Sequence, residues 1–257
     1  MADGVLKGKV ALVTGGGAGL GRGIAEELAR AGADIAIAEI DPAAGQTAAD
    51  ELTQHGVRAQ AYPTDVSDSA QVDASFQRAT ADLGRLDVVV NNAGISRIGP
   101  HTQDVTDQDW NDSIAVLQTG VFFGMRAAGR IMLEQGSGAI INISSIRGFS
   151  PNPGRMAYCA AKAAVIMMTS IAAGEWASRG IRVNAIAPGV MRTPMWDSDV
   201  AAGIIDEEAY LELVPAKRLG IPADVGRLAV YLASDAAAYV NGSCIAIDGA
   251  LTSIPAG

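Results

Sequence analysis

The feature that most constrains the fold of this chain is the alternation of short apolar runs with longer helical patterns. Apolar runs rich in β-branched residues occupy 10–13, 35–38, 59–62, 86–90, 139–143, 182–187 and 244–247. Strands that are apolar on both faces belong in a parallel sheet that helices cover on either side. Helical patterns between the runs include 21–31, 43–55, 70–83 and 158–178. The alternation predicts a doubly wound α/β fold with a mostly parallel, seven-stranded sheet and helices on both faces.

The length and the apolar content agree with one domain over residues 1–257. The chain has 257 residues, of which 49% are apolar, and this is enough for a full-sized core around one sheet. Residues 188–222 interrupt the alternation with several prolines and an acidic helical stretch at 206–213, but no strand. A long excursion after a strand is typical of a binding loop, so we predict a lid around 190–218.

Charge and composition argue against several classes of partner. The 28 acidic residues outnumber the 19 basic ones, and Lys and Arg form no cluster that would suit nucleic acid or an anionic membrane. His55, His101, Cys159 and Cys244 lack metal-ligand spacing, and we expect both cysteines to be reduced thiols. Neither a signal peptide nor a run of ~20 apolar residues is evident. We expect a cytoplasmic protein that binds neither metal, nucleic acid nor membrane.

A glycine-rich segment follows the first apolar run. Residues 14–21 are TGGGAGLG and lead directly into a helical pattern. Glycines let the backbone turn sharply and approach a pyrophosphate closely, and the free N–H groups of a helix N-terminus attract its negative charge. Glycine also serves ordinary turns. The position between the first strand and the first helix therefore supports the prediction of a dinucleotide site.

Glu39 ends the second apolar run, about 20 residues after the glycines. A carboxylate at this place can accept hydrogen bonds from both hydroxyls of the adenosine ribose, and it repels a 2′-phosphate. Gly16, Gly17 and Ile40 supply no positive charge for such a phosphate. We therefore predict NAD rather than NADP, with an ordinary strand-end acid as the alternative interpretation of Glu39. Asp65 and Val66 follow the third run, where a carboxylate can meet the adenine amino group.

Ser145, Tyr158 and Lys162 compose the predicted reacting centre. Ser145 follows the fifth run, and the tyrosine and lysine, four residues apart, share one face of a helical pattern. A phenol titrates near ~10, and a neighbouring cation together with a positive nicotinamide ring favours its ionised form. The Ser145 hydroxyl can hold the substrate oxygen. Because a Tyr-x-x-x-Lys pair alone is usually structural, the assignment depends on the whole set of motifs.

These motifs come in a characteristic order. They are TGxxxGxG at 14–21, NNAG at 91–94, Ser145 thirteen positions before Tyr158, YxxxK at 158–162 and PGxxxT at 188–193. Together they resemble the short-chain dehydrogenase/reductase family in its compact, single-domain branch, over essentially the whole chain. The resemblance implies a Rossmann-type fold and an NAD-dependent alcohol dehydrogenase or ketone reductase. The Asp248-Gly249 turn also matches, although Ala250 replaces the second glycine of the family.

The resemblance implies a role for each matching residue. Tyr158 would be the general acid/base, Lys162 would bind the nicotinamide ribose and tune the phenol, and Ser145 would orient the reacting oxygen. Thr193 and the Val190 backbone would hold the nicotinamide carboxamide. The implied cofactor contacts are Gly15, Gly17, Gly19, Leu20, Gly21, Glu39, Ile40, Asp65, Val66, Asn92, Ala93, Gly94, Tyr158, Lys162, Pro188, Gly189, Val190 and Thr193.

Leu117 departs from the family pattern. The family commonly has an asparagine at this place, which holds a water beside the lysine, and leucine can hold none. We expect an altered proton path, with simple core packing of Leu117 as the alternative. A catalytically weak NAD-binding sensor or scaffold on the same fold is the second hypothesis for the whole chain. Reduction of an imine or a sugar carbonyl is a third.

The substrate and the assembly are predicted from side chains around these motifs. Expected substrate contacts are Ser96, Arg147, Arg155, Met195 and Trp196. The last two suit an apolar or ring-bearing alcohol, and the arginines suit an anionic group, with a surface role as their alternative. Helical patterns at 117–132 and 158–176 are apolar around much of their circumference. The family pairs these helices between subunits, so we expect a homotetramer, with a dimer as the second choice.

Overall fold

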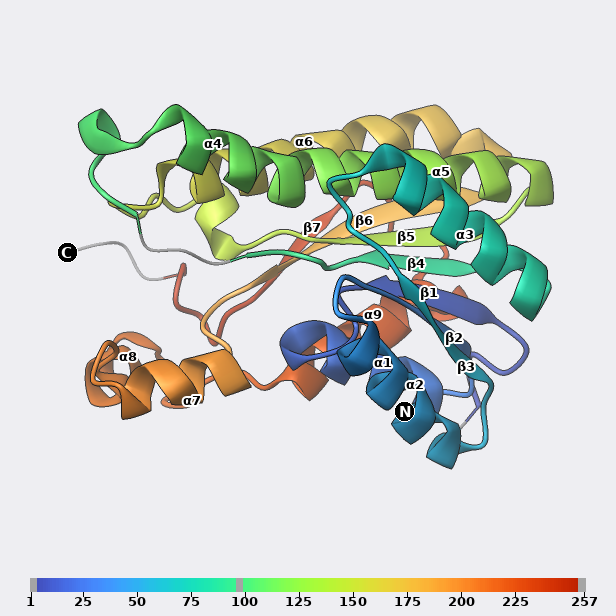
Figure 1. Ribbon diagram of the computed structural model, residues 1–257, viewed down its shortest axis with the longest axis horizontal. Helices are drawn as coiled ribbons and strands as arrows, with labels where there is room; N and C mark the ends of the chain where they lie inside the picture. Colours follow the sequence, from blue (N-terminus) through green and yellow to red (C-terminus); the bar gives the residue numbers. More distant parts are fainter. Residues whose placement is uncertain (1–3, 96–98, 254–257) are drawn as a thin grey trace.

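The sheet is wound in two directions from its centre. The computed structural model describes residues 4–95 and 99–253, without the side chain of Met195. Its seven strands have the order β3-β2-β1-β4-β5-β6-β7, and all neighbours are parallel (Figure 1). The predicted doubly wound α/β fold is therefore confirmed.

The strands coincide closely with the apolar runs. They are β1 (Val10–Thr14), β2 (Asp34–Glu39), β3 (Ala59–Pro63), β4 (Val88–Asn91), β5 (Gly138–Ile143), β6 (Ile181–Pro188) and β7 (Cys244–Ile247). The helices are α1 (Gly19–Arg30), α2 (Pro42–Leu52), α3 (Ser69–Leu83), α4 (Asp107–Ile114), α5 (Gly120–Gln135), α6 (Met156–Trp176), α7 (Pro194–Ala201), α8 (Glu207–Leu213) and α9 (Pro222–Ala233).

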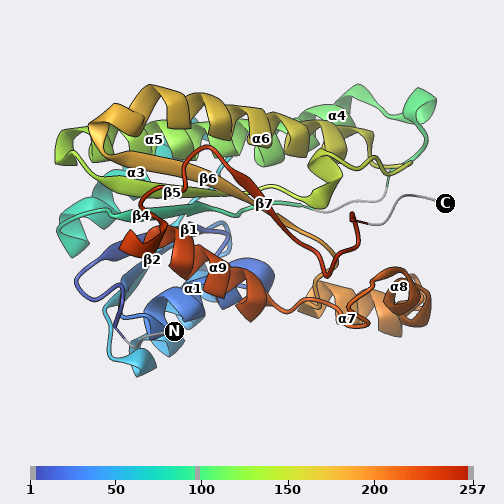
Figure 2. The ribbon, with the colours of Figure 1, turned by 180° about the vertical axis from the view of Figure 1, so that it is seen from behind.

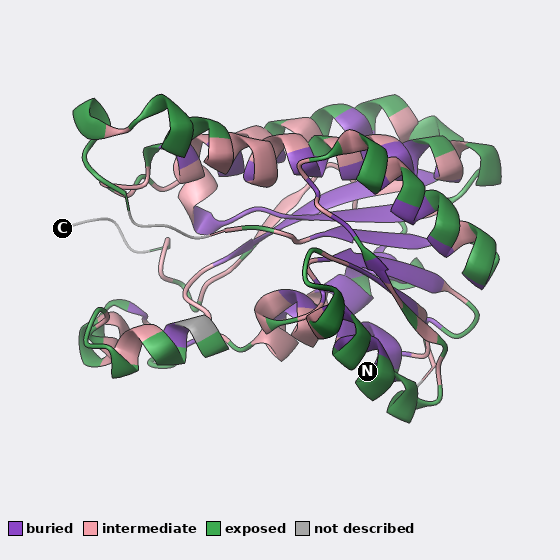
Figure 3. Ribbon diagram, viewed as in Figure 1, coloured by how far each residue is buried: buried purple, intermediate pink, exposed green. Residues whose placement is uncertain are grey.

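Two helical layers enclose the sheet. Figures 1 and 2 show α1, α2 and α9 on one face and α3, α5 and α6 on the other. Side chains of a strand alternate between the two faces, so Ala11 and Val13 of β1 join the core beneath α1, whereas Val10 and Leu12 join the core beneath α3 and α5. The five inner strands are buried almost throughout, whereas the edge strands β3 and β7 are mostly half-buried (Figure 3). Burial on both faces is why these runs are apolar without alternation.

The sheet reverses its winding between β1 and β4. From β1 the chain adds β2 and β3 on one side, then returns to place β4 on the other side of β1. At such a reversal the connections leave in opposite directions, and ligands of doubly wound sheets bind at the carboxyl ends of these strands. The glycine-rich segment and the NNAG segment both begin there, after Thr14 and at Asn91.

The excursion after β6 forms two short helices, α7 and α8, which project beyond the carboxyl edge of the sheet (orange in Figure 1). Glu207 at the start of α8 accepts a hydrogen bond from Trp196 Nε1 at 3.0 Å and pairs with Arg192. The Trp196 ring also meets the Tyr210 ring edge-on, at 5.1 Å between centroids. These contacts join α7 to α8, and the acidic stretch predicted at 206–213 corresponds to α8. Its role as a substrate lid stays a prediction.

The sequence-based expectation that no stretch is long and apolar enough to cross a membrane is wrong for helix α6. Its continuation to Arg179 meets that requirement by length and composition. The helix packs against β6 and α4, and core helices of water-soluble proteins meet the same requirement. The cysteines, Cys159 and Cys244, are both free thiols.

Candidate active site

The glycine loop after β1 is shaped for a close approach. Gly15 and Gly19 have positive φ angles of 65° and 55°, a conformation that side-chain-bearing residues rarely adopt. A Cβ on Gly21 would lie 2.1 Å from the Gly15 carbonyl oxygen, so only glycine fits there. The N-cap residue Ala18 offers no side-chain hydrogen bond to α1. The first N–H groups of α1 therefore remain available for an anion.

The NNAG segment holds this loop in place. Asn92 Nδ2 donates to the carbonyl oxygens of Thr14 at 3.0 Å and Gly15 at 3.2 Å. In return, Thr14 Oγ1 accepts from the backbone N–H groups of Asn92 and Ala93, both at 3.0 Å. The ends of β1 and β4 are thereby fastened together. An open glycine cradle with free helix N–H groups fits the pyrophosphate of a dinucleotide.

Glu39 lies against the same loop. Its carboxylate accepts hydrogen bonds from the N–H groups of Gly17 and Ile40, each at 2.9 Å, and of Asp41 at 3.3 Å. A Cβ on Gly17 would lie 2.9 Å from Glu39 Oε2, so this glycine makes room for the acid. A negative charge is therefore fixed beside the cradle.

The third strand supplies the next polar group. Asp65 Oδ1 accepts hydrogen bonds from the Ser67 N–H at 2.9 Å and the Ser67 hydroxyl at 2.7 Å, which fixes the orientation of the carboxylate. Val66 is 9% exposed, and Gly120 packs against it so closely that a Cβ there would meet Val66 Cγ2 at 3.0 Å. The segment thus presents an oriented acid and an apolar wall, as an adenine contact requires.

The three predicted catalytic residues converge at the carboxyl ends of β5 and β6. Ser145 is buried after β5, and its hydroxyl accepts the Arg147 N–H at 3.1 Å. Tyr158 and Lys162 come from the first two turns of α6, and the Lys162 Nζ lies 5.8 Å from the centre of the Tyr158 ring. Lys162 is 4% exposed, and its Nζ donates to the Ile143 carbonyl oxygen at 2.7 Å.

Burial dominates the electrostatics of this centre. It raises the pKa of the Tyr158 phenol, while a hydrogen bond with Ser145 and the charges of Arg155 and Arg147 lower that pKa. Burial also lowers the pKa of Lys162 to about 8. The expectation of an easily ionised phenol included the positive charge of a nicotinamide ring beside it. For the side chains of the protein by themselves, burial is the largest effect and raises the pKa of Tyr158, because a buried phenolate is costly.

Leu117 lies in a π-helical turn, Ala115–Thr119, between α4 and α5. The Gly120 N–H bonds to the Ala115 carbonyl five residues back, so the helix is locally wider than an α-helix. Leu117 is 1% exposed, and its Cδ2 would lie 3.2 Å from a Cβ on Gly94. The side chain also borders a cavity that Tyr158 lines. It therefore occupies apolar space close to the reacting centre.

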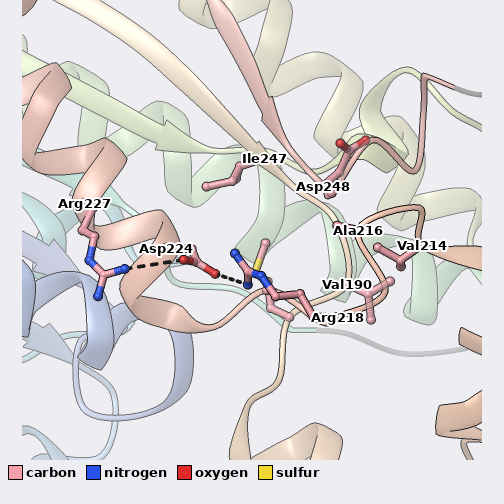
Figure 4. A pocket seen from close by; sticks show the side chains of 11 residues that line it. Val190, Val214, Ala216, Arg218, Asp224, Arg227, Ile247 and Asp248 are labelled. Atoms are coloured by element: carbon pink, nitrogen blue, oxygen red, sulfur yellow. Dashed lines mark hydrogen bonds and ion pairs between the residues drawn. The ribbon is translucent and has the colours of Figure 1, made fainter. Parts of the chain in front are cut away.

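The segment after β6 meets the turn that follows β7. Pro188 ends β6, and a Cβ on Gly189 would lie 2.7 Å from the Asp248 Cβ, so the two segments touch. Val190 and Asp248 line a cavity of about 150 Å³ at the root of the lid, where Asp224 bridges two arginines (Figure 4). Thr193 caps α7 by accepting the Trp196 N–H at 3.3 Å.

The predicted substrate contacts fall into three groups. Arg147 and Arg155 are close enough to Tyr158 to influence its ionisation. Trp196 is 9% exposed and packed within the lid, so its contact with substrate stays a prediction. Ser96 and the Met195 side chain lie outside the described residues.

Sequence analysis did not identify Asp109 and Ser113, which line the same cavity as Leu117 and Tyr158. Their spacing of four residues, continued by Leu117, was the available signal of a shared helix face.

Comparison with known proteins decides the family. A family model described as enoyl-(acyl carrier protein) reductase matches residues 15–252. A D-threitol dehydrogenase from Mycolicibacterium smegmatis is 37% identical, with 96% of this chain and 94% of the relative covered. The chain belongs to the short-chain dehydrogenase/reductase family. Its fold class and nicotinamide-dependent oxidoreductase chemistry follow from this membership.

Two further relatives have informative descriptions. A 2,5-dichloro-2,5-cyclohexadiene-1,4-diol dehydrogenase from Sphingobium indicum is 38% identical over 95% of this chain and 96% of the relative. A crystal structure from Agrobacterium tumefaciens with bound NADP is 36% identical, covers 97% of this chain and 98% of its own, and has a TM-score of 0.88. The relatives support an oxidoreductase of hydroxyl-bearing substrates.

Proposed function

We propose that this enzyme transfers a hydride between NAD(H) and a secondary alcohol or its ketone, with small diols or polyols as the substrate class. The observation that carries the proposal is the convergence of Ser145, Tyr158 and Lys162 after β5, in a sheet whose first strand, β1, leads into the glycine cradle. The threitol and diol dehydrogenases among its relatives support hydroxyl-bearing substrates.

Each residue of the centre has a distinct task in alcohol oxidation. The Ser145 hydroxyl orients the substrate oxygen, and the Tyr158 phenolate removes its proton as the carbinol carbon loses a hydride. A nicotinamide ring bound in this site would supply the hydride acceptor. The Lys162 ammonium binds ribose hydroxyls and favours the phenolate by its charge. In ketone reduction the proton moves in the opposite direction, from Tyr158 to the oxygen.

Glu39 supports NAD as the preferred cofactor. Its carboxylate already accepts the Gly17 N–H, one of the donors that a 2′-phosphate would need. A phosphate at this place would meet a fixed negative charge, whereas two ribose hydroxyls can donate to it. The related structure with bound NADP makes this preference a question for measurement.

The remaining cofactor contacts follow the course of the site. Asp65 and Val66 are proposed to meet adenine, and Thr193 with the Val190 backbone to hold the carboxamide. The proposed working form is a cytoplasmic homotetramer, with α7 and α8 as the substrate lid. Metal, nucleic acid and membrane have no part in the proposal.

The test is production of NADH from a panel of diols, polyols and other secondary alcohols. We expect turnover with NAD at least ~10-fold better than with NADP in kcat/KM, because charge repulsion of this kind is worth ~1.4 kcal/mol or more.

Tyr158→Phe should lower kcat by ~100-fold or more and leave NADH binding nearly intact. NADH binding without turnover of any alcohol would favour the sensor hypothesis instead, and equal rates with NADP would refute the cofactor preference.

A further inference from the structure

Tyr158 must exchange a proton with the solvent in every turnover. In alcohol oxidation the substrate O–H bond breaks and a phenol O–H bond forms, and the phenol must lose that proton before it can act as a base again. The Tyr158 side chain is half-buried, and burial raises the pKa of its phenol. A substrate held at Ser145 covers the phenol further. A route that the substrate does not block would let the proton leave while the product is still bound.

A cavity of about 170 Å³ begins at Tyr158. It lies where α4 and the N-terminus of α6 meet (Figure 1). Its lining passes from the buried Leu117 and the half-buried Tyr158 to the half-buried Ser113 and the exposed Asp109. Because ~10–15 Å³ of such space admits one water, the cavity has room for several. It therefore joins the reacting centre to the protein surface through a space that water can fill.

The polar side chains of α4 in this cavity follow one another along one face of the helix. Asp109 and Ser113 are four residues apart, so their backbones are about 6 Å apart along the helix axis. An O–H···O hydrogen bond is about 2.8 Å long, and one bridging water spans such a step. Leu117, one step further on, offers no hydrogen bond. Water beside the phenol therefore finds its partners on α4 at Ser113 and Asp109.

Both side chains are held in place. The Ser113 hydroxyl donates to the Asp109 carbonyl oxygen at 2.8 Å, and its own oxygen can accept hydrogen bonds from water. The Thr106 hydroxyl donates to Asp109 Oδ2 at 2.7 Å and accepts the Asp109 N–H at 3.1 Å, which fixes the carboxylate at the start of α4. On the α6 side the guanidinium of Arg155 also lines the cavity. The opposite charge of Asp109 offsets the repulsion between that guanidinium and a proton.

We propose that Ser113 and Asp109 form an outlet for the Tyr158 proton. Water in the cavity accepts the proton from the phenol, Ser113 anchors that water, and the Asp109 carboxylate passes the proton to bulk solvent. Each O–H bond that breaks along the path is replaced by one on the next oxygen, so one H⁺ reaches the solvent for each alcohol oxidised and each NAD reduced. In ketone reduction a proton enters by the same path. The proposal rests on the proposed dehydrogenase function and adds two positioning residues to it, since both act through water.

Matched variants separate this role from the part that both residues play in the helix. Asp107 is a second exposed acid in the first turn of α4, and it is absent from the described residues that line the cavity. Asp107→Asn therefore removes a similar charge without touching the path. Threonine and valine have nearly the same shape, so Ser113→Thr and Ser113→Val differ only in whether a hydroxyl remains. Asp109→Glu keeps a carboxylate that Asp109→Asn removes.

The experiment follows NADH production in H₂O and in D₂O at low buffer concentration, with D-threitol as the first of the polyols tried. Asp109→Asn and Ser113→Val should each lower kcat by about 10-fold, less than the ~10²–10⁴-fold of a group in contact with substrate. Their solvent isotope effects should rise, because proton release becomes rate-limiting. Added imidazole should restore much of the kcat of Asp109→Asn, since a diffusible base can replace the carboxylate. Asp109→Glu and Ser113→Thr should stay near the wild type, and Asp107→Asn should match it.

A crystal structure gives a readout that needs no turnover. Ordered water should join the Tyr158 hydroxyl to the Asp109 carboxylate in the wild type and be interrupted in Ser113→Val. A dry cavity, or an unchanged kcat and isotope effect in both Asp109→Asn and Ser113→Val, would overturn the proposal and leave the dehydrogenase function standing. A loss of kcat without a larger isotope effect or rescue by imidazole would also overturn it, as would an equal loss in Asp107→Asn. Ordered water in an enzyme that oxidises no alcohol would instead refute the dehydrogenase function.

Discussion

Lys162 holds an ammonium group in a place that water hardly reaches. The side chain is 4% exposed, and one hydrogen bond to the Ile143 carbonyl replaces part of its hydration. Burial lowers its pKa from 10.5 to about 8, a difference worth roughly 3 kcal/mol. The residue that the mechanism needs is thus a source of instability, as is common for catalytic groups.

The sign of this effect determines how stability should depend on pH. Between pH 8 and 10.5 the unfolded chain keeps the Lys162 proton, whereas the folded chain has lost it. Because the unfolded state then binds more protons, the free energy of unfolding rises with pH across this window. Below pH 8 both states are protonated and the full cost of the buried charge remains. We expect Lys162→Met to be more stable than the wild type at pH 7 by roughly 1–3 kcal/mol, and this advantage to vanish towards pH 10.

Urea unfolding at pH 7, 8, 9 and 10 measures the difference. Lys7→Met is the control, because Lys7 is exposed and its replacement removes a solvated charge. Its effect on the free energy of unfolding should stay small throughout. Parallel pH profiles of the wild type and Lys162→Met would contradict the argument.

Single residues also show where a sequence motif has a physical reason. Ala250 replaces the second glycine of the family's turn and has a φ of 70°, a conformation that favours glycine. The backbone of the turn is therefore kept although the residue differs. The spacing in the sequence predicts that Glu39 lies near the glycine loop. The hydrogen bond that its carboxylate accepts from the Gly17 N–H was not predictable, because the direction of a side chain depends on the packing around it.

At the level of elements, strands were the most predictable part. Runs such as 35–38 are buried on both faces, so burial alone dictates apolar residues there. The π turn at Ala115–Thr119 was not predictable, since it is one hydrogen-bond shift within a helical pattern. As a result the cavity lined by Asp109, Ser113 and Leu117 remained hidden in the sequence.

Leu117 in that turn fills apolar space where the family has an asparagine. We expect Leu117→Asn to keep the fold, with a loss of stability of about 1–3 kcal/mol for a buried amide. It should change kcat and its solvent isotope effect, because an amide can hold water beside Lys162, while NAD affinity changes little. Single-turnover kinetics in H₂O and D₂O measure this. Leu117→Met keeps the site apolar and should leave the isotope effect as it is. An unchanged isotope effect in the asparagine variant would show that Leu117 merely packs.

At the scale of the whole molecule, the apolar outer faces of α5 and α6 stand out. Phe122 on α5 is 45% exposed, and Met167 and Ile171, one turn apart on α6, are 63% and 53% exposed. Figure 3 shows exposed and half-buried residues along this outer layer, on the side away from the sheet. Neighbouring apolar side chains on one surface commonly mark a contact with another protein.

We expect this surface to be covered by the same surface of a second subunit within a homotetramer. The wild type should then have a solution mass near four times 26.3 kDa by light scattering. Ile171→Glu should break the assembly, because two carboxylates would be brought together without water at the contact. Ile204→Glu, which changes a residue of the lid that is even more exposed than Ile171, should leave the mass unaltered. A wild type that stays monomeric at micromolar concentration would contradict the proposed assembly. If the tetramer survives Ile171→Glu, the contact between subunits lies elsewhere, and the exposed apolar residues of α6 need another explanation.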